Sequence, residues 1–122
     1  MAAEKVIVET LEKIGQEVNG FIAVSLVDMD TGMTLGQKTV NPNFDLGVAS
    51  AYNTEMVKQK LKIMRTLNLK GSLEDMLLTL SDQLHLIKFV TPKTFIYLAA
   101  DRASTNLAVI RSTVQKYVDT LK

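Results

Sequence analysis

The pattern of apolar and polar side chains near the N-terminus predicts one helix followed by two strands. Apolar side chains first recur at intervals of three and four residues, at Ile7, Leu11, Ile14 and Val18. This spacing places them on one face of a helix that ends near Asn19-Gly20. The segments that follow, "FIAVSLV" (21–27) and "MTLGQK" (33–38), predict a buried strand and its hairpin partner.

A long helix is predicted over residues 45–68. It follows the loop "VNPNFD" (40–45), in which Asp45 is positioned to cap the first helical turn. With successive residues about 100° apart, the apolar side chains cover an arc of about 180°, whereas an ordinary surface helix has a stripe little over 100° wide. The arc contains Leu46, Ala49, Tyr52, Met56, Val57, Leu61, Ile63, Met64 and Leu67. An arc of this width indicates two apolar neighbours, and the protein's own sheet is only one of them.

Polar side chains occupy the rest of this helix and interrupt the arc. Opposite the arc lie Glu55, Lys58, Lys62 and Arg65. Asn53 and Lys60 fall inside the arc. Part of the arc must therefore lie near water or a polar partner, although a lysine can also extend its amine out to solvent.

Three short β segments and a final helix complete the pattern. The strands are predicted at residues 73–81, 84–90 and 94–101, and the connections between them are short enough to imply antiparallel neighbours. A last helix over residues 103–121 carries one apolar stripe. The element order α-β-β-α-β-β-β-α predicts an α/β (α+β) fold, in which helices cover one five-stranded antiparallel sheet.

The length and composition fit a single domain over residues 1–122. Apolar side chains make up 47% of the chain and charged ones 22%, which is ordinary for a globular protein. The N-terminus mixes charged with apolar residues, unlike a signal peptide, and no apolar run is long enough to span a membrane. The chain has no cysteine, which excludes disulfides, thiolate nucleophiles and cysteine zinc sites. A cytoplasmic location is expected.

The charge of the chain is unevenly distributed. Residues 1–55 carry 3 basic and 8 acidic side chains, whereas residues 56–122 carry 11 and 5. Much of the positive charge comes from Lys58, Lys60, Lys62, Arg65 and Lys70. A run of this kind is most often the solvated face of a helix, and it can also attract an acidic partner. The net charge of +1 is too small to indicate a nucleic-acid-binding protein.

The stretch "LVDMDTG" (26–32) is the first candidate for catalytic or metal chemistry. Counted from Asp28 as a calcium loop of the EF-hand kind, position 6 is Met33 where glycine is required. The stretch also resembles the Asp-x-Asp-x-Thr motif of haloacid-dehalogenase-type phosphatases, but its threonine comes one residue early, at Thr31. A turn between two strands accounts for every residue, with Gly32 supplying a positive φ.

The rest of the sequence also lacks the motifs of a catalytic site. His85 is the only histidine, and it lies inside an apolar strand without a nucleophile motif beside it. The glycines do not form a phosphate-binding motif. Aromatic residues are not interleaved with the basic ones, so nucleic acid is not expected as a partner. The sequence predicts a binding protein rather than an enzyme, with no catalytic residue, cofactor or metal.

Four stretches, taken in order, relate the chain to a known family. They are Asn19-Gly20 before the first strand, "VDMDTG" (27–32) at the first hairpin, "LNLKGSLEDMLLTL" (67–80) and "AADRASTNLAVIR" (99–111). In these stretches the chain resembles the roadblock family, the relatives of dynein light chains that also occur in bacteria as partners of Ras-like GTPases. The resemblance extends from about residue 4 to residue 121. It implies a profilin-like sandwich, with the long helix on one face and the terminal helices on the other, in a bacterial or archaeal protein.

The resemblance further implies a homodimer formed through the long helix and the strand that follows it. The residues expected at this interface are Tyr52, Met56, Lys60, Ile63, Leu67, Leu77 and Thr79. Lys58, Lys62 and Arg65 are expected to face a second partner, a small Ras-like GTPase whose own loops carry out the hydrolysis. An adaptor dimer that bridges larger proteins without a GTPase is the alternative function. A small-molecule sensor is a third, although the sequence does not bring convergent polar groups together for it.

Overall fold

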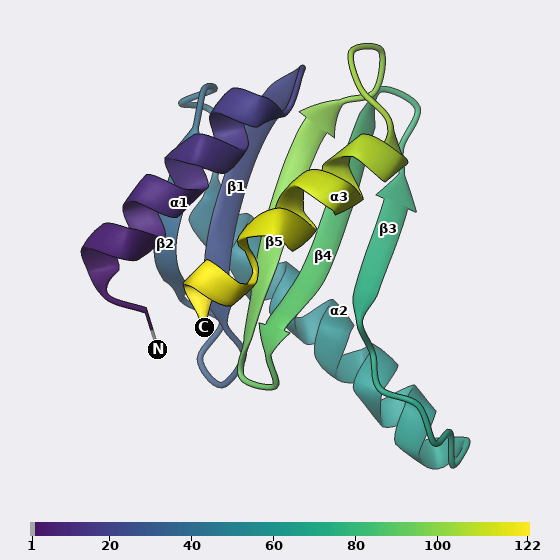
Figure 1. Cartoon of the computed structure of the whole chain (residues 1–122). Helices are drawn as coiled ribbons and strands as arrows, with labels where there is room; N and C mark the ends of the chain where they lie inside the picture. Colours follow the sequence, from purple (N-terminus) through teal and green to yellow (C-terminus); the bar gives the residue numbers. More distant parts are fainter. Residues whose placement is uncertain (1) are drawn as a thin grey trace.

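The computed structural model describes residues 2–122 and contains one five-stranded sheet with three α-helices (Figure 1). In chain order the elements are α1 (Glu4–Glu17), β1 (Phe21–Asp28), β2 (Thr34–Thr39), α2 (Leu46–Thr66), β3 (Asp75–Thr79), β4 (Gln83–Thr91), β5 (Thr94–Asp101), α3 (Leu107–Tyr117) and the 3-10 helix η1 (Asp119–Leu121). The strands lie in the order β2-β1-β5-β4-β3, and all neighbours are antiparallel. The predicted element order and antiparallel sheet are confirmed.

The helices cover both faces of the sheet, as in a profilin-like sandwich. α1 and α3 lie over one face, and α2 crosses the other face diagonally (Figure 1). Neighbouring residues of a strand point to opposite faces, so the sheet separates two clusters of buried side chains. The α1/α3-side cluster includes Leu11, Leu86 and Leu98, and the α2-side cluster includes Val57 and Phe95. β5 lies in the middle of the sheet and contributes to both.

The two predicted helix starts differ in how well the structure matches them. α2 begins as expected, because the Asp45 carboxylate accepts a hydrogen bond from the Val48 N–H at 3.1 Å and caps the first turn. α3 begins at Leu107, later than the predicted residue 103. There the Asn106 side chain accepts a hydrogen bond from the Val109 N–H at 3.0 Å and caps the helix. The residues before Asn106 form a turn that the apolar spacing does not distinguish from helix.

Only the first part of α2 rests on the sheet. Its buried residues are Leu46, Ser50, Thr54 and Val57. Beyond Val57 the helix continues past the sheet, and the connection to β3 runs back along it (Figure 1). We call residues 58–66 the arm. None of the helices in the described chain combines the length and apolar character needed to cross a bilayer.

The edge strand β3 is held in place by α3 as well as by β4. Arg111 of α3 donates two hydrogen bonds to the Asp75 carboxylate, at 3.0 and 3.1 Å. A two-pronged pair of this kind is stronger than a single contact between charges. The Asp75 side chain is only 18% exposed, which further protects the pair from solvent. The start of β3 is therefore held to the C-terminal helix α3.

Removing this pair should loosen β3 more than the rest of the sheet. We expect Arg111→Ala to lower the free energy of unfolding by about 1 kcal/mol, because Asp75 loses both donors. Amide hydrogen exchange should accelerate in β3 and stay unchanged in β1. The control is Lys93→Ala, which removes the exposed pair with Asp30 (3.3 Å) and should cost less than about 0.5 kcal/mol. Equal exchange rates in β3 for the two variants would contradict the fastening role.

Candidate partner-binding surface

One flank of α2 exposes apolar side chains that no described part of the chain covers. Tyr52 is 71% exposed, Ile63 is 47% exposed and Leu67, just after the helix, is 64% exposed. Met56 lies between them and is half-buried against the α2-side cluster. We call these four residues the apolar flank. The predicted arc is therefore divided: Leu46 and its neighbours face the sheet, and the apolar flank faces solvent.

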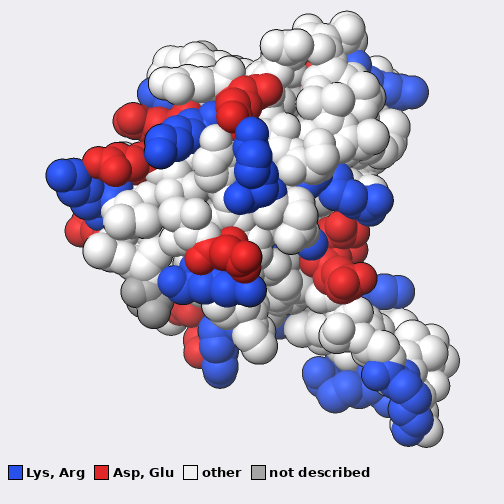
Figure 2. Space-filling view, in the orientation of Figure 1, with Lys and Arg blue, Asp and Glu red and all other residues white. Residues whose placement is uncertain are grey.

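The other exposed flank of α2 is basic. Lys58, Lys62 and Arg65 are all exposed and, at about 100° per residue, lie on roughly the opposite side of the helix from the apolar flank. We call them the basic flank. Residues 56–73 contain five basic side chains and no acidic one. Figure 2 shows the projecting end of the molecule covered by basic side chains without an acidic neighbour. Positive charge is thus concentrated on the arm, which projects beyond the sheet.

The structure places the other predicted interface residues in different surroundings. Lys60 is exposed on the arm, near the apolar flank. Leu77 packs against the α1/α3-side cluster, and Thr79 follows it on the same face of β3. The β3 side chains on the α2 side are Met76 and Leu78. The side chains of Leu77 and Thr79 therefore do not join the apolar flank on one face, and their part in an interface stays a prediction.

A polar chain of hydrogen bonds lies between α2 and the sheet. The Tyr97 hydroxyl is 3.2 Å from Nδ1 of His85, and Nε2 of His85 is 2.8 Å from the Gln83 side-chain oxygen. Gln83 Oε1 can only accept, so Nε2 donates and Nδ1 is left to accept from the tyrosine. Burial raises the pKa of Tyr97 to about 12, and the adjacent Asn53 side chain offsets part of that rise. Both contacts are satisfied by the neutral form of His85, which burial favours.

Stability should therefore fall when the solution becomes acidic enough to protonate His85. Burial lowers the pKa of His85, an effect that Asp82 partly opposes. The folded protein thus binds this proton less tightly than the unfolded chain does, so the stabilisation is complete above the ordinary pKa of about 6.5 and is lost as pH falls below it. Urea unfolding at pH 7.5 and at pH 5.5 should show a smaller pH dependence for His85→Gln than for the wild type. An identical dependence would show that another group titrates.

The stretch 26–32 forms the turn that its sequence predicts. Gly32 has a φ of 75°, and its N–H donates to the Asp28 carbonyl at 2.8 Å. The Thr31 hydroxyl donates to the Asp28 carboxylate at 2.7 Å, so the turn satisfies its own polar groups. Among residues 2–122, His, Cys, Asp and Glu side chains do not gather in a group that could hold a metal ion. This turn supplies no feature of a catalytic loop.

Solved structures with the same architecture identify the fold. MglB from Myxococcus xanthus superposes with a TM-score of 0.88 at 14% identity, covering 99% of this chain and 88% of that one. The chain has the roadblock fold. A roadblock domain from Streptomyces avermitilis matches with a TM-score of 0.81 at 13% identity, covering 99% and 95% of the two chains. The gliding protein MglB from Thermus thermophilus matches with a TM-score of 0.83 at 15% identity, covering 99% and 90%.

The roadblock fold is recognised here by structure rather than by sequence similarity. A further matching structure, at a TM-score of 0.82 and 15% identity, is described as MglB with a tetrameric arrangement. No protein-family model matches the sequence, and no curated protein matches it. The fold is thus shared with these structures while most side chains differ.

One feature of this roadblock fold is not predicted by the sequence, the contact between Tyr97 and His85. The sequence predicts His85 only as a lone histidine inside an apolar strand. Both side chains point to the α2 side of neighbouring antiparallel strands, and their rings meet edge to face with centroids 5.4 Å apart. Alternation along the two strands predicts their shared face, but the register that brings them together depends on the Thr91–Thr94 turn.

Proposed function

We propose that the protein is a non-enzymatic homodimer that binds and regulates a small Ras-like GTPase in the cytoplasm. The observation that carries this proposal is the division of α2 into an apolar flank and a basic flank. The roadblock fold and the family resemblance support a GTPase as the partner. Regulation would come from binding and repositioning the GTPase's own loops, so this chain needs no arginine finger.

The apolar flank is suited to self-association. Tyr52 and Leu67 are separated by about 22 Å along the helix axis, so the flank forms a long strip and not an isolated residue. Large exposed apolar side chains gathered in this way mark interaction surfaces. A second copy related by a twofold axis would set the same strip against itself. The tetrameric arrangement of one MglB structure gives a precedent for self-association within the fold.

The basic flank is suited to an acidic surface on a different protein. Lys58, Lys62 and Arg65 point away from the apolar flank, so both flanks can be occupied at the same time. Exposed cations of this kind raise the association rate with an acidic partner more than they raise the affinity. A salt-dependent association rate together with a salt-independent dimer is the expected behaviour.

The test is a nucleotide-dependent binding experiment with the dimer as bait. Immobilised protein is incubated with a lysate of the source organism containing either GDP or a non-hydrolysable GTP analogue, and bound proteins are identified by mass spectrometry. We expect a small GTPase to be retained in one nucleotide state, and Lys58→Glu combined with Lys62→Glu to lose it. Retention of no GTPase in either state would exclude the regulatory role.

The adaptor function is distinguished by the same experiment. An adaptor would retain larger proteins equally with GDP and with the GTP analogue. The apolar flank supports both functions, because each needs the dimer. The nucleotide dependence alone separates them.

A further inference from the structure

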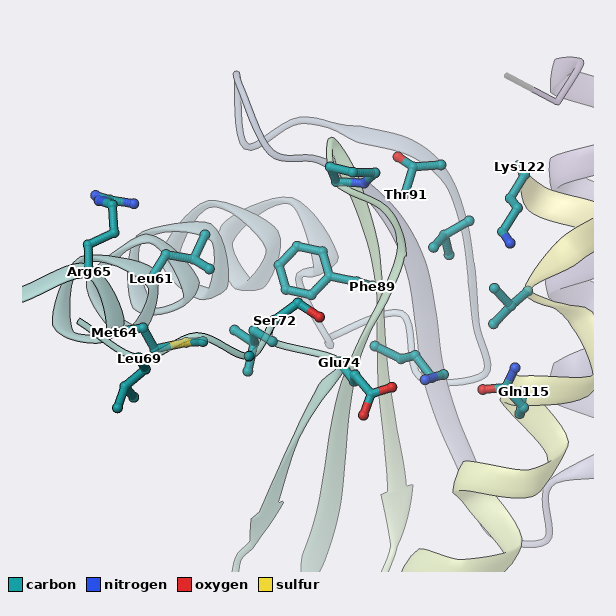
Figure 3. Close-up of a pocket in the computed structure, with 16 residues that line it drawn as sticks. Leu61, Met64, Arg65, Leu69, Ser72, Glu74, Phe89, Thr91, Gln115 and Lys122 are labelled. Carbon is teal, nitrogen blue, oxygen red and sulfur yellow. The ribbon is translucent and has the colours of Figure 1, made fainter. Parts of the chain in front are cut away.

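A groove opens at the corner of the molecule where the arm leaves the sheet. Its volume is about 670 Å³, within the range of about 300–1,000 Å³ typical of binding sites. It lies between the end of α2, residues 71–74, the last residues of β4 and the end of α3. Figure 3 shows Phe89 in its middle, with Leu61 and Met64 toward the arm and Gln115 and Lys122 on the opposite side. The groove is separate from both exposed flanks of α2 except at Arg65.

The groove lies at a break in the strand pairing. β3 pairs with β4 only as far as Asp75 opposite Lys88, whereas β4 continues to Thr91. One further bond, from the Phe89 N–H to the Glu74 carbonyl at 3.1 Å, closes the ladder. Beyond this bond, the segment before β3 and the end of β4 separate. Within the described chain, no backbone N–H of residues 70–74 donates a hydrogen bond to another backbone group.

Unpaired backbone N–H groups beside the end of a strand can donate hydrogen bonds to the carbonyl oxygens of an added strand. An extended peptide gains main-chain hydrogen bonds by such addition, and its alternate side chains enter separate environments on the two faces. Gly71, at the edge of the groove, has open space where a side chain would be, so the backbone there is accessible to a peptide. The groove is partly open to solvent, so it can admit a peptide segment.

The two faces of the groove differ in chemistry. On the α2 side the lining is apolar, because Leu61, Leu73 and Phe89 belong to the margin of the α2-side cluster. On the α3 side it is cationic, with Lys88 and Lys122. The cross-strand neighbour of Lys88 is Asp75, whose carboxylate is already bonded to Arg111.

The positive charge on the α3 side remains available to a ligand. Lys88 forms no ion pair within residues 2–122, and the Lys122 pair with Asp119 is largely exposed and readily exchanged. Glu74 is the one carboxylate that lines the groove, against three cationic side chains with Arg65 included. An anionic side chain entering from a strand would therefore be attracted.

We propose that this groove binds an extended segment of a partner protein in which apolar and acidic residues alternate. Added beside the end of β4, such a strand places its apolar side chains against Leu61 and Phe89. Its acidic side chains then point to Lys88 and Lys122. The period of two along a strand matches the two-sided lining of the groove. This site can be tested separately from the GTPase proposal, because Arg65 is the one residue of the two flanks that lines the groove.

The test uses a fluorescein-labelled peptide of alternating leucine and aspartate, seven residues long, titrated with the full chain and followed by fluorescence anisotropy. We expect saturable binding, and at least about tenfold weaker binding to the double variant Lys88→Glu and Lys122→Glu. The matched control is Lys58→Glu with Lys62→Glu, which makes the same change in net charge outside the groove and should bind as the wild type does. Hydrogen exchange should slow at residues 71–74 when the peptide binds.

Three outcomes would overturn the proposal. The first is no saturable binding up to about 1 mM peptide, which is weaker than any specific site of this kind. The second is equal weakening by the groove variant and the control variant, which would mean unspecific attraction between charges. The third is equal binding of a leucine–lysine peptide, or of a peptide of the same composition with its leucines and aspartates in separate blocks.

Discussion

Combining Ile63→Asp with Leu67→Asp should convert the proposed dimer into a monomer. Both side chains are about half or more exposed in the single chain, so the substitutions leave its core intact. At a dimer contact each would place an unpaired carboxylate in an apolar surface, which costs several kcal/mol. We expect the dimer to weaken at least about a hundredfold, or roughly 3 kcal/mol. Light scattering of the wild type and the double variant at equal concentration measures the change.

The control for this experiment is an aspartate at another exposed apolar residue. Met33 is 66% exposed at the first hairpin and does not belong to the apolar flank, so Met33→Asp should leave the proposed dimer intact. A wild-type dimer that is not weakened by added salt would fit an apolar contact, because salt screens attraction between charges and does not weaken the burial of apolar surface. A wild-type monomer at tens of micromolar, or a double variant that is still dimeric, would place the contact elsewhere.

Val57→Asp should cost more stability than any other single change discussed here. Val57 is fully buried and is the last buried residue of α2. A carboxylate there has no partner in the α2-side cluster, and burying an unpaired charge is among the few mechanisms that cost about 4 kcal/mol or more. Urea unfolding followed by circular dichroism measures the loss.

The adjacent residue supplies the control for Val57. Lys58 is exposed, so Lys58→Asp changes the charge at almost the same place and should shift the free energy of unfolding by no more than about 0.5 kcal/mol. If Val57→Asp cost less than about 1 kcal/mol, α2 could separate from the sheet without unfolding it. That result would mean that the helix is not part of the cooperative core.

The fold could be predicted from the sequence because its signals are local and repeated. The spacing of Ile7, Leu11 and Ile14 predicts α1, and all three are buried. The strand boundaries were right to within about two residues, because alternation and turn residues define them. The start of α3 was predicted too early. A turn followed by the Asn106 cap has the same apolar spacing as a longer helix.

The candidate site was predictable only in part. The width of the apolar arc on α2 predicts a second contact. Tyr52, Ile63 and Leu67 are exposed, and the contact itself stays a prediction. The two faces of β3 were harder to assign to the two sides of the sheet, because both carry leucines. The packing of Leu77 against the α1/α3-side cluster shows which face is which. The groove has no sequence signal, since it arises where residues 71–74 separate from the end of β4.

In the arm, the exposed side chains that are free for binding are separated from the buried side chains that stabilise the fold. Substitutions at exposed positions beyond Val57 cost little folding free energy, because those side chains contact little of the core. Changes of partner can therefore accumulate there by single mutations, each leaving a folded domain on which the next can act. A domain built this way can acquire new interactions quickly while its architecture persists at low sequence identity.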